Sequence, residues 1–414
     1  MSGVVTINSG DLLDAIYPQL KPRIISEPEV AQQPYSYIVF TDGTGYYAKN
    51  AKTGTIEYSD TDASKVIQYA INALPDYYSG LVHIKAGRYV CKSIINIPSG
   101  DVHLEIRGEG MHNTILSFET SETYSNLKGA ITAVSSYFYQ DEPFTVSGQQ
   151  LSRLGMSAFL GIRDLTVQVK DPNLNGIVTS KIPRLIISNV RIKGYYTNTV
   201  PPTSPYTIGL FIYESINNDM YLIENLTISG FTHGVDHKAD HTVYIVPEVG
   251  KVRNGFKFNG YGVIAIRPHV YGVHEAAYIL AGTNSDITLI NPRAEGPTST
   301  YATVLSIPSG QTPMVSIHRL TYYGSFASLI NVPYQNIRFS GVQWQASGTA
   351  TIAADSTRVT VNHGLIVAPS KVLITPLNQP PGRLWVENIT STSFNITTDT
   401  APTANLTVAW YAEV

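Results

Sequence analysis

Aromatic, basic and acidic residues recur at fixed places of one eight-residue phrase in the second half of the chain. It reads Ala-Ile-Arg-Pro-His-Val-Tyr-Gly at 265–272, Leu-Ile-Asn-Pro-Arg-Ala-Glu-Gly at 289–296 and Ile-His-Arg-Leu-Thr-Tyr-Tyr-Gly at 317–324. Apolar residues or proline hold positions one and four, and mostly six, so the residues between them are expected to face outward. Stacking the phrases gathers six side chains into one patch: Tyr271, Tyr322, His269, Arg293, Arg319 and Glu295.

This patch suits a sugar, because an aromatic ring stacks on the C–H face of a pyranose while charged neighbours bond its hydroxyls. The alternative is that these are solvated outer residues that stabilise the sheet through cross-strand pairs. Asn189 and Asn225 at position three would then form a stacked amide ladder. The patch predicts glycan binding, with the structural role left open.

Carboxylates for catalysis are sparse on the expected outer faces. Glycoside hydrolysis uses two carboxyl groups roughly 5–9 Å apart. The candidates are Glu295, Glu275 and Asp236, and Asp240 and Glu248 lie near them in the sequence. Because they form no compact acidic motif, we assign no catalytic residue and expect binding without turnover. The rival hypothesis is a polysaccharide lyase or glycoside hydrolase in which Glu295 pairs with a carboxylate from 231–262.

The histidine-rich run at 232–241 is a candidate metal site, since His237 and His241 are four residues apart and have aspartates beside them. That spacing brings two imidazoles together only on a helix. Gly234 and the strand-like context argue against a helix. We therefore expect a solvated loop, with no metal and no cofactor.

The phrase is a repeat that predicts a solenoid. Its copies start at 162, 187, 223, 265, 289 and 317, so successive starts are 25, 36, 42, 24 and 28 residues apart. Short strands at such a period stack into coils of about 22–28 residues. The two long intervals predict insertions near 195–210 and 231–262, where loops on a rigid scaffold carry specificity.

The rest of the chain divides into segments of different pattern. Residues 1–36 are Pro-rich and are expected to form an N-terminal arm. A hairpin over 37–47 precedes a helix over 60–75, capped at Asp60 or Thr61, and short strands follow to 118. Residues 119–159 are expected to be a long loop. Five alternating strands in 346–414 predict a small antiparallel β-sandwich.

The opening series resembles pectin-lyase-like right-handed parallel β-helix proteins. It consists of the helix, Lys-Ala-Gly-Arg-Tyr at 85–89, Ile-Pro-Ser-Gly at 97–100 and Glu-Ile-Arg-Gly-Glu-Gly at 105–110. In that family the helix plugs the first open end, which would otherwise expose unpaired strand edges. Tyr46–Asn50 with Thr53–Glu57 is similar to the lead-in of such proteins from archaea and their viruses. The last segment is similar to C-terminal modules of phage tail fibres and, more loosely, to H-type lectin domains.

Composition narrows the class further. With 43% hydrophobic and 14% charged residues, the chain has a core-forming composition, and a formal charge of −3 favours no nucleic-acid partner. The first residues lack the pattern of a signal peptide, and no run is long enough to insert in a membrane. One cysteine, Cys91, is expected to be buried rather than nucleophilic.

Together these features predict an all-β protein. It has a right-handed parallel β-helix over 37–345 with an N-terminal α-helical cap, followed by the β-sandwich at 346–414. The resemblances imply a virion-surface or extracellular spike or tail-fibre protein that binds host-surface glycan. They also imply a homotrimer held to other virion proteins through the N-terminal arm. A purely structural coat protein is the remaining alternative.

Overall fold

The computed structural model describes most of the chain from Tyr35 to Val414. The exceptions are 76–78, 98–102, 121–127, 135–143, 147–148, 152–158, 181, 197–200, 202, 204–205, 214–219, 331–336, 341–344 and 366–367. The predicted arm at 1–36 falls outside the described residues except for its last two. Among the described residues, no helix has both the length and the apolar character needed to cross a membrane.

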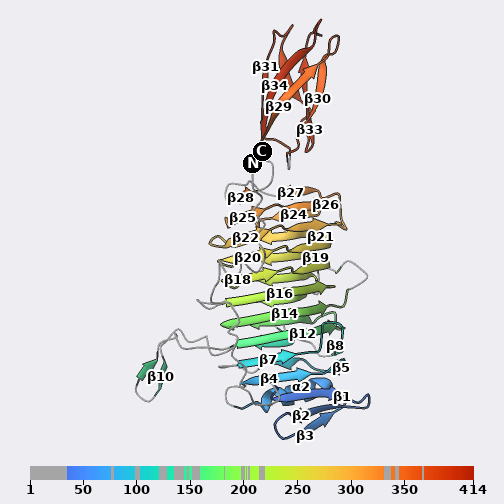
Figure 1. Ribbon diagram of the computed structural model, residues 1–414, viewed down its shortest axis with the longest axis vertical. Coiled ribbons are helices and arrows are strands. Elements are labelled where there is room, and N and C mark those ends of the chain that lie inside the picture. Colours follow the sequence, from blue (N-terminus) through green and yellow to red (C-terminus); the bar gives the residue numbers. More distant parts are fainter. Residues whose placement is uncertain are drawn as a thin grey trace, which may run out of the picture. The chain divides into compact units, whose positions relative to one another are not determined.

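Three parallel sheets run along the solenoid, because successive coils add strands to each sheet at equivalent places (Figure 1). Sheet 1 contains β4 (Gly80–Ile84), β7 (His103–Arg107), the first halves of β12 (Phe159–Val169), β14 (Arg184–Lys193) and β16 (Met220–Ser229), then β18 (Thr242–Ile245), β20 (Val263–Ile266), β22 (Asp286–Ile290), β25 (Met314–His318) and β28 (Ile337–Ser340).

Sheets 2 and 3 take the later parts of each coil. Sheet 2 contains β5 (Gly87–Cys91), β8 (Thr114–Phe118), the second halves of β12, β14 and β16, the first parts of β19 (Glu248–Phe258) and β21 (His269–Leu280), then β23 (Arg293–Glu295) and β26 (Thr321–Tyr323). Sheet 3 contains β6 (Ile95–Asn96), β9 (Gly129–Val134), β13 (Asn175–Ser180), β15 (Ile208–Ile212), β17 (His233–His237), the second parts of β19 and β21, β24 (Thr303–Ser306) and β27 (Ser328–Ile330).

The core of the solenoid is built from the apolar positions of the phrase, as predicted. In one coil these are Ile187, Val190 and Ile192, all fully buried. Position three interrupts the strand pairing, because the register of β14 with β16 passes from the pair Ser188 and Glu224 directly to the pair Val190 and Leu226. It forms the corner between sheets 1 and 2 with a left-handed backbone, as at Asn189 (φ 54°) and Asn225 (φ 47°). Asparagine suits this corner because its short polar side chain tolerates positive φ.

A complete coil occupies the stretch that was predicted to be an insertion at 231–262. Tyr244 pairs with Ala265, and Glu248 pairs with His269, so Tyr244–Lys251 is a seventh copy of the phrase in register with the next. The copy was missed because Val246 replaces the usual corner residue and Lys251 replaces the final glycine, both with positive φ. The 42-residue interval between 223 and 265 is therefore two coils.

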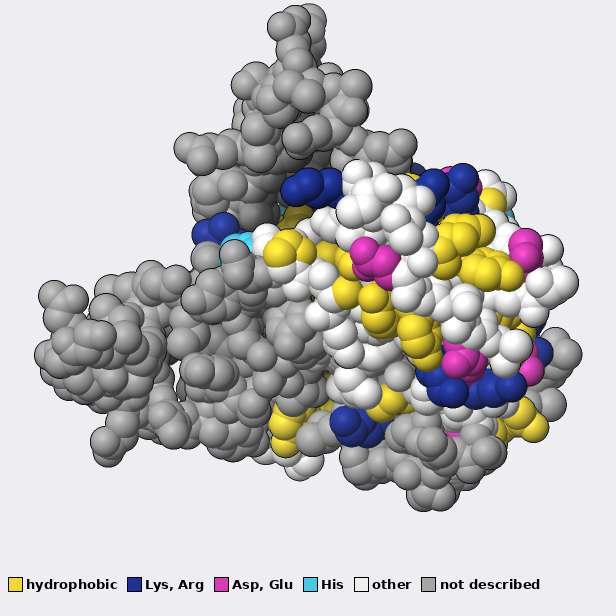
Figure 2. All heavy atoms as spheres, turned by 90° about the horizontal axis from the view of Figure 1, so that it is seen from below, with side chains coloured by type: hydrophobic (Ala, Val, Ile, Leu, Met, Phe, Trp, Pro, Cys, Tyr) yellow, Lys and Arg dark blue, Asp and Glu magenta, His cyan; other side chains and the backbone are white. Residues whose placement is uncertain are grey.

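The N-terminal end is capped as expected. Strands β1 (Tyr37–Thr41), β2 (Tyr46–Asn50) and β3 (Ile56–Asp60) pair antiparallel and lead into helix α2 (Ala63–Asn72). The helix cap is Asp62 rather than Asp60 or Thr61, since its side chain accepts from the Ser64 backbone N–H. The helix buries one face, which includes Val66, Ile67, Ala70 and Ile71. Figure 2 views this end along the axis and shows scattered apolar side chains among polar and charged ones.

The expectation of a long loop at 119–159 was partly wrong. β9 pairs in parallel with β13, because Ala130, Ile131 and Ala133 supply an apolar stretch that packs in the core. A hairpin of β10 (Phe144–Val146) and β11 (Gln149–Leu151) also lies in this segment. Cys91 at the end of β5 is fully buried, and burial raises the pKa of its thiol well above the usual value, as fits a packing residue.

The C-terminal segment forms two antiparallel three-stranded sheets with a common core. One sheet orders β29 (Gln345–Ile352), β34 (Leu406–Glu413) and β31 (Lys371–Pro376), and the other orders β30 (Arg358–Asn362), β33 (Ser393–Thr398) and β32 (Leu384–Glu387). Five of these strands were predicted, and β29 is an addition. Phe394, Ile396 and Val408 are fully buried between the sheets, which makes this unit a small β-sandwich.

Candidate functional site

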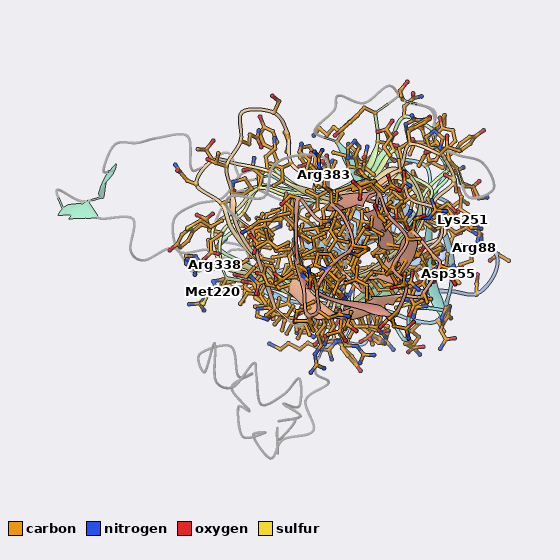
Figure 3. The ribbon with its side chains drawn as sticks, turned by 90° about the horizontal axis from the view of Figure 1, so that it is seen from above. Arg88, Met220, Lys251, Arg338, Asp355 and Arg383 are labelled. Carbon is orange, nitrogen blue, oxygen red and sulfur yellow. The ribbon has the colours of Figure 1, made fainter. Side chains whose placement is uncertain are left out.

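The outer face of sheet 2 brings polar and aromatic side chains of four successive coils into two adjacent rows. In one row Glu248 pairs with His269, which pairs with Arg293. In the other row Tyr271 pairs with Glu295, which pairs with Tyr323. We call these six residues the sheet 2 patch. Seen along the solenoid axis, Arg88 of sheet 2 and Lys251 at its far corner project on the side opposite Met220 and Arg338 of sheet 1 (Figure 3).

His269 lies between two carboxylates. Its Nδ1 atom is 3.3 Å from Glu248 Oε2, and its Nε2 atom is 3.1 Å from Glu295 Oε1. Successive parallel strands are about 4.8 Å apart, so these two glutamates stand about 10 Å apart along the sheet. The imidazole therefore bridges carboxylates from the coils on either side of its own, and fixes their orientation.

Arg293 engages Glu295 and an aromatic ring. Its Nη2 and Nε atoms donate to Glu295 Oε2 at 2.6 Å and 3.1 Å, and its guanidinium carbon lies 5.1 Å from the centroid of Tyr323. The hydrogen bond from Arg293 holds the pKa of the Glu295 carboxyl below its ordinary value. Glu295 is thus an ionised hydrogen-bond acceptor at neutral pH.

Tyr271 leans over the preceding coil. Gly250 is its strand partner, and a Cβ atom at Gly250 would stand only 2.0 Å from Tyr271 Cζ. The Tyr271 and His269 rings lie 5.7 Å apart between centroids. Burial, followed by the charge of Glu248, raises the pKa of the Tyr271 phenol, so the hydroxyl keeps its proton at neutral pH. Its ring and hydroxyl are available for stacking and hydrogen bonding.

Two of the six predicted patch residues have different places from those expected. Tyr323, not Tyr322, pairs with Glu295; Tyr322 pairs with the inward-facing Ala294, because it holds position six of its phrase. Tyr322 packs edge-on near Phe326, with centroids 6.3 Å apart, and is 38% exposed. Arg319 lies at the corner between sheets 1 and 2 with φ 55°, beside the patch rather than within its strands.

Of the other carboxylate candidates, Asp236 lies on sheet 3 and Glu275 at the bulge of β21 between sheets 2 and 3, so neither stands beside Glu295. Glu275 accepts from Arg253 Nε at 2.8 Å and from Asn254 Nδ2 at 2.7 Å. Burial raises the pKa of its carboxyl, but these hydrogen bonds and the charge of Arg253 hold it below the ordinary value overall. Asp236 is 3% exposed and forms an ion pair with Lys257 at 3.0 Å. Both acids belong to pairs that stabilise the solenoid.

The histidine-rich run is buried, contrary to the expected solvated loop. His233 lies under the ring of Tyr206, with centroids 4.5 Å apart, and His237 is inside the solenoid. His237 Nε2 is 2.7 Å from the Ala239 carbonyl, and its Nδ1 is 2.9 Å from the Tyr244 hydroxyl. Burial lowers the pKa of each imidazole to about 4. Both ring nitrogens of His237 have partners inside the solenoid, so its role is structural, and His241 lies at a corner with φ 44°.

Within the described ranges, no three His, Cys, Asp or Glu side chains are grouped so that they could hold a metal ion. The site residues that sequence reasoning missed are Gly250 and Tyr323, and it considered Glu248 only as a carboxylate of the expected insertion. Pro247 could have revealed the places of Glu248 and Gly250, because it holds position four of its phrase as Pro268 and Pro292 do in theirs. Tyr323 is position seven of the phrase that begins at Ile317, so a direct count would have identified it.

Comparison with other proteins finds similar folds among solved structures but no match to a protein family. No protein-family model matches this chain, and no curated protein matches it. Among solved structures it is similar to ORF18 of Geobacillus virus E2, with 14% identity and a TM-score of 0.40 over 83% of this chain and 74% of that one.

Two tailspike proteins are also similar. For gp49 of Pseudomonas phage LKA1 the identity is 13% and the TM-score 0.29, over 84% of this chain and 92% of that one. For gp49 of the Acinetobacter baumannii bacteriophage Fri1, a capsular polysaccharide depolymerase, the identity is 9% and the TM-score 0.30, over 85% of this chain and 82% of that one. The parallel strand pairing that continues from coil to coil gives this chain the parallel β-helix fold.

Proposed function

We propose that this protein is a surface-exposed recognition protein, a spike or fibre component, that binds glycan of a host surface through the sheet 2 patch. The supporting observation is that Tyr271 and Tyr323 occupy the same row two coils apart, on either side of Glu295. Aromatic faces with ionised and hydrogen-bonding groups between them match the alternating C–H faces and hydroxyls of a sugar chain.

The orientation of a bound glycan follows from the rows. Each row runs along the solenoid axis with about 4.8 Å between coils, which is close to the length of one sugar residue in an extended chain. In a glycan that lies along the axis, each successive sugar would therefore contact the next coil of the solenoid. Tyr271 and Tyr323 would contact alternate sugars, and Glu295 would accept hydroxyl hydrogens from the sugar between them.

Binding is favoured over hydrolysis by the state of the acids. A glycoside hydrolase needs one carboxyl group whose pKa is raised so that it can donate a proton. The pKa values of Glu295 and Glu275 are instead held low by arginine. A hydrolase that relied on Glu295 or Glu275 as its acid would therefore lack a proton donor of the kind this chemistry requires.

The proposal includes a location on the virion or cell surface and assembly as a homotrimer. Several weak sites on one particle would act together, which raises the overall strength of attachment without new contacts. The molecular mass in solution, measured by light scattering, tests the trimer. A monomer mass over the working concentration range would contradict this part of the proposal.

Glycan-array binding of the full chain tests the proposed site. We compare the wild-type protein with Tyr271→Ala and Tyr323→Ala, and use Tyr261→Ala as the control because Tyr261 is 52% exposed and lies away from sheet 2. Loss of an aromatic contact of about 0.5–1.5 kcal/mol predicts roughly a two- to tenfold weaker affinity for each patch variant. Equal binding by all four proteins would overturn the proposal.

Turnover is measured in the same samples. New reducing ends or unsaturated uronates released from a retained polysaccharide would establish a hydrolase or a lyase in place of a binding protein. If no saccharide is retained and none is cleaved, the purely structural alternative stands.

A further inference from the structure

A row of corner residues runs beside the sheet 2 patch, with arginine at every second coil. Arg267, Asn291 and Arg319 occupy equivalent places in three successive coils, with φ values of 53°, 51° and 55°. Their backbone N–H groups donate to carbonyl oxygens of the next coil at 2.7, 2.7 and 2.9 Å, so the row continues the solenoid ladder. The side chains of all three are exposed. The two arginines thus project from one edge about 10 Å apart.

Arginine is an unfavourable residue at this corner. A side chain larger than asparagine in the left-handed region costs about 1 kcal/mol or more. Earlier coils place Asp164, Asn189, Asn225 and Val246 here, and the first three form a ladder in which Asn189 donates to Asp164 at 2.7 Å and Asn225 to Asn189 at 2.9 Å. This ladder ends at Val246, and the coils after it carry Arg267 and Arg319 although Asn291 between them shows that asparagine fits the same corner, so the corner itself does not require arginine.

The charges of the patch are largely paired internally, and the two arginines are the exception. Glu248 is bound by His269, and Glu295 is bound by both His269 and Arg293. Neither Arg267 nor Arg319 forms an ion pair with a carboxylate of the described residues. The guanidinium groups of Arg267 and Arg319 are therefore left to meet a ligand beside the patch.

The two-coil period of the arginines coincides with that of the aromatic residues. One coil carries Arg267 with Tyr271, the coil two further along carries Arg319 with Tyr323, and the coil between them carries Asn291 with Glu295. A polymer that matches this surface repeats every two sugar residues. Its acidic group falls on the residue next to an arginine, and its uncharged residue falls next to Glu295.

We propose that the ligand is an acidic polysaccharide with a disaccharide repeat, bound along the solenoid axis with the carboxylate of each alternate residue at Arg267 and Arg319. The planar guanidinium holds a carboxylate through two parallel hydrogen bonds. Glu295 would repel a second carboxylate on the intervening residue, so a polymer charged on every residue fits less well. This inference rests on the proposed glycan-binding function and specifies the class of glycan.

Binding of defined polysaccharides to the full chain tests the inference. The probes are hyaluronan, which carries a carboxylate on every second residue, its carboxyl-reduced form, polygalacturonate, dextran sulfate and neutral dextran. We expect hyaluronan to bind more tightly than the other four. We also expect its affinity to fall with added salt, because exposed charges are screened.

The variants are Arg267→Asn and Arg319→Asn, singly and together. Asparagine suits the left-handed corner, so thermal stability should be unchanged or higher while charge is lost. Each substitution should weaken hyaluronan binding by roughly tenfold, the effect of one hydrogen-bonded ion pair. Arg184→Gln serves as the control, because this exposed arginine begins β14 on sheet 1, far from the patch.

The two levels of proposal fail differently. If Tyr271→Ala weakens binding of a neutral glycan but the asparagine variants bind hyaluronan like wild type, the acidic-ligand inference is overturned while the glycan-binding function stands. Equal or tighter binding of dextran sulfate or polygalacturonate would overturn the disaccharide repeat. Absence of binding to every saccharide would overturn both.

Discussion

The ring of Tyr271 lies directly above Gly250 of the preceding coil, so close that a Cβ atom there would be 2.3 Å or less from three ring carbons. The glycine is therefore what allows the ring to lie against sheet 2. Because Gly250 and Tyr271 are strand partners, a single methyl group on one coil decides the orientation of an aromatic side chain on the next.

Gly250→Ala should lift Tyr271 from the sheet without removing it. Glycan affinity should then fall by about as much as in Tyr271→Ala, roughly two- to tenfold, since the stacking contact is lost in both. Isothermal titration with an oligosaccharide retained on the array measures this effect. The double variant should be no weaker than either single one, because both act on the same ring. Additive losses would contradict the geometry.

Asn189→Ala should destabilise the solenoid at the corner between sheets 1 and 2. The change removes the hydrogen bonds of Asn189 with Asp164 and Asn225 and leaves a residue with a Cβ atom at φ 54°. We expect a loss of about 2 kcal/mol in the free energy of unfolding. Asn189→Gly is the matched control: it removes the same bonds but accepts the backbone, so it should cost less by about 1 kcal/mol. Urea denaturation compares them, and equal losses would show that the backbone conformation does not matter.

Acid should destabilise the protein before its carboxylates are protonated. The pKa values of His233 and His237 are lowered by burial to about 4, whereas an exposed histidine has a pKa near 6.5. Between these values the unfolded chain binds the protons first, so the free energy of unfolding falls as the pH is lowered from about 6.5 to about 4. Each histidine contributes a slope of up to about 1.4 kcal/mol per pH unit.

Urea midpoints at pH 7, 5.5 and 4.5 measure this slope. His237→Gln should reduce this slope by the contribution of one histidine, even if the variant is less stable than the wild type at every pH. A midpoint that does not change between pH 7 and pH 4.5 would show that these imidazoles are not kept neutral by the fold.

Lys257→Met should leave the buried Asp236 carboxylate without its partner. The ion pair is 3.0 Å long and the Asp236 side chain is only 4% exposed, so we expect a loss of about 3 kcal/mol in the free energy of unfolding. Adding Asp236→Asn should recover part of this loss, because the uncompensated charge is removed. A double variant less stable than Lys257→Met would contradict the pairing. Glycan binding should be unchanged in both, since they lie on sheet 3.

Sequence by itself determined the repeating unit of this protein. Apolar residues at fixed positions of the phrase, such as Ile187 and Val190, can be buried together only if successive copies stack, so the solenoid and its interior follow from the pattern. The capping helix and five of the six described strands of the C-terminal sandwich were also predictable, because each has a local signal of alternation or period.

Only the tertiary structure decided which side chains meet. Register between coils depends on pairings such as Glu248 with His269, which link positions 21 residues apart and leave no local pattern in the chain. Equivalent positions of successive coils can also share a backbone conformation without sharing a residue type. Val246 and Lys251 have the positive φ of their corners although other coils place asparagine, arginine or glycine there. For this reason the sequence pattern predicted that Glu248 lies in an insertion, whereas in the structure it is the strand partner of His269.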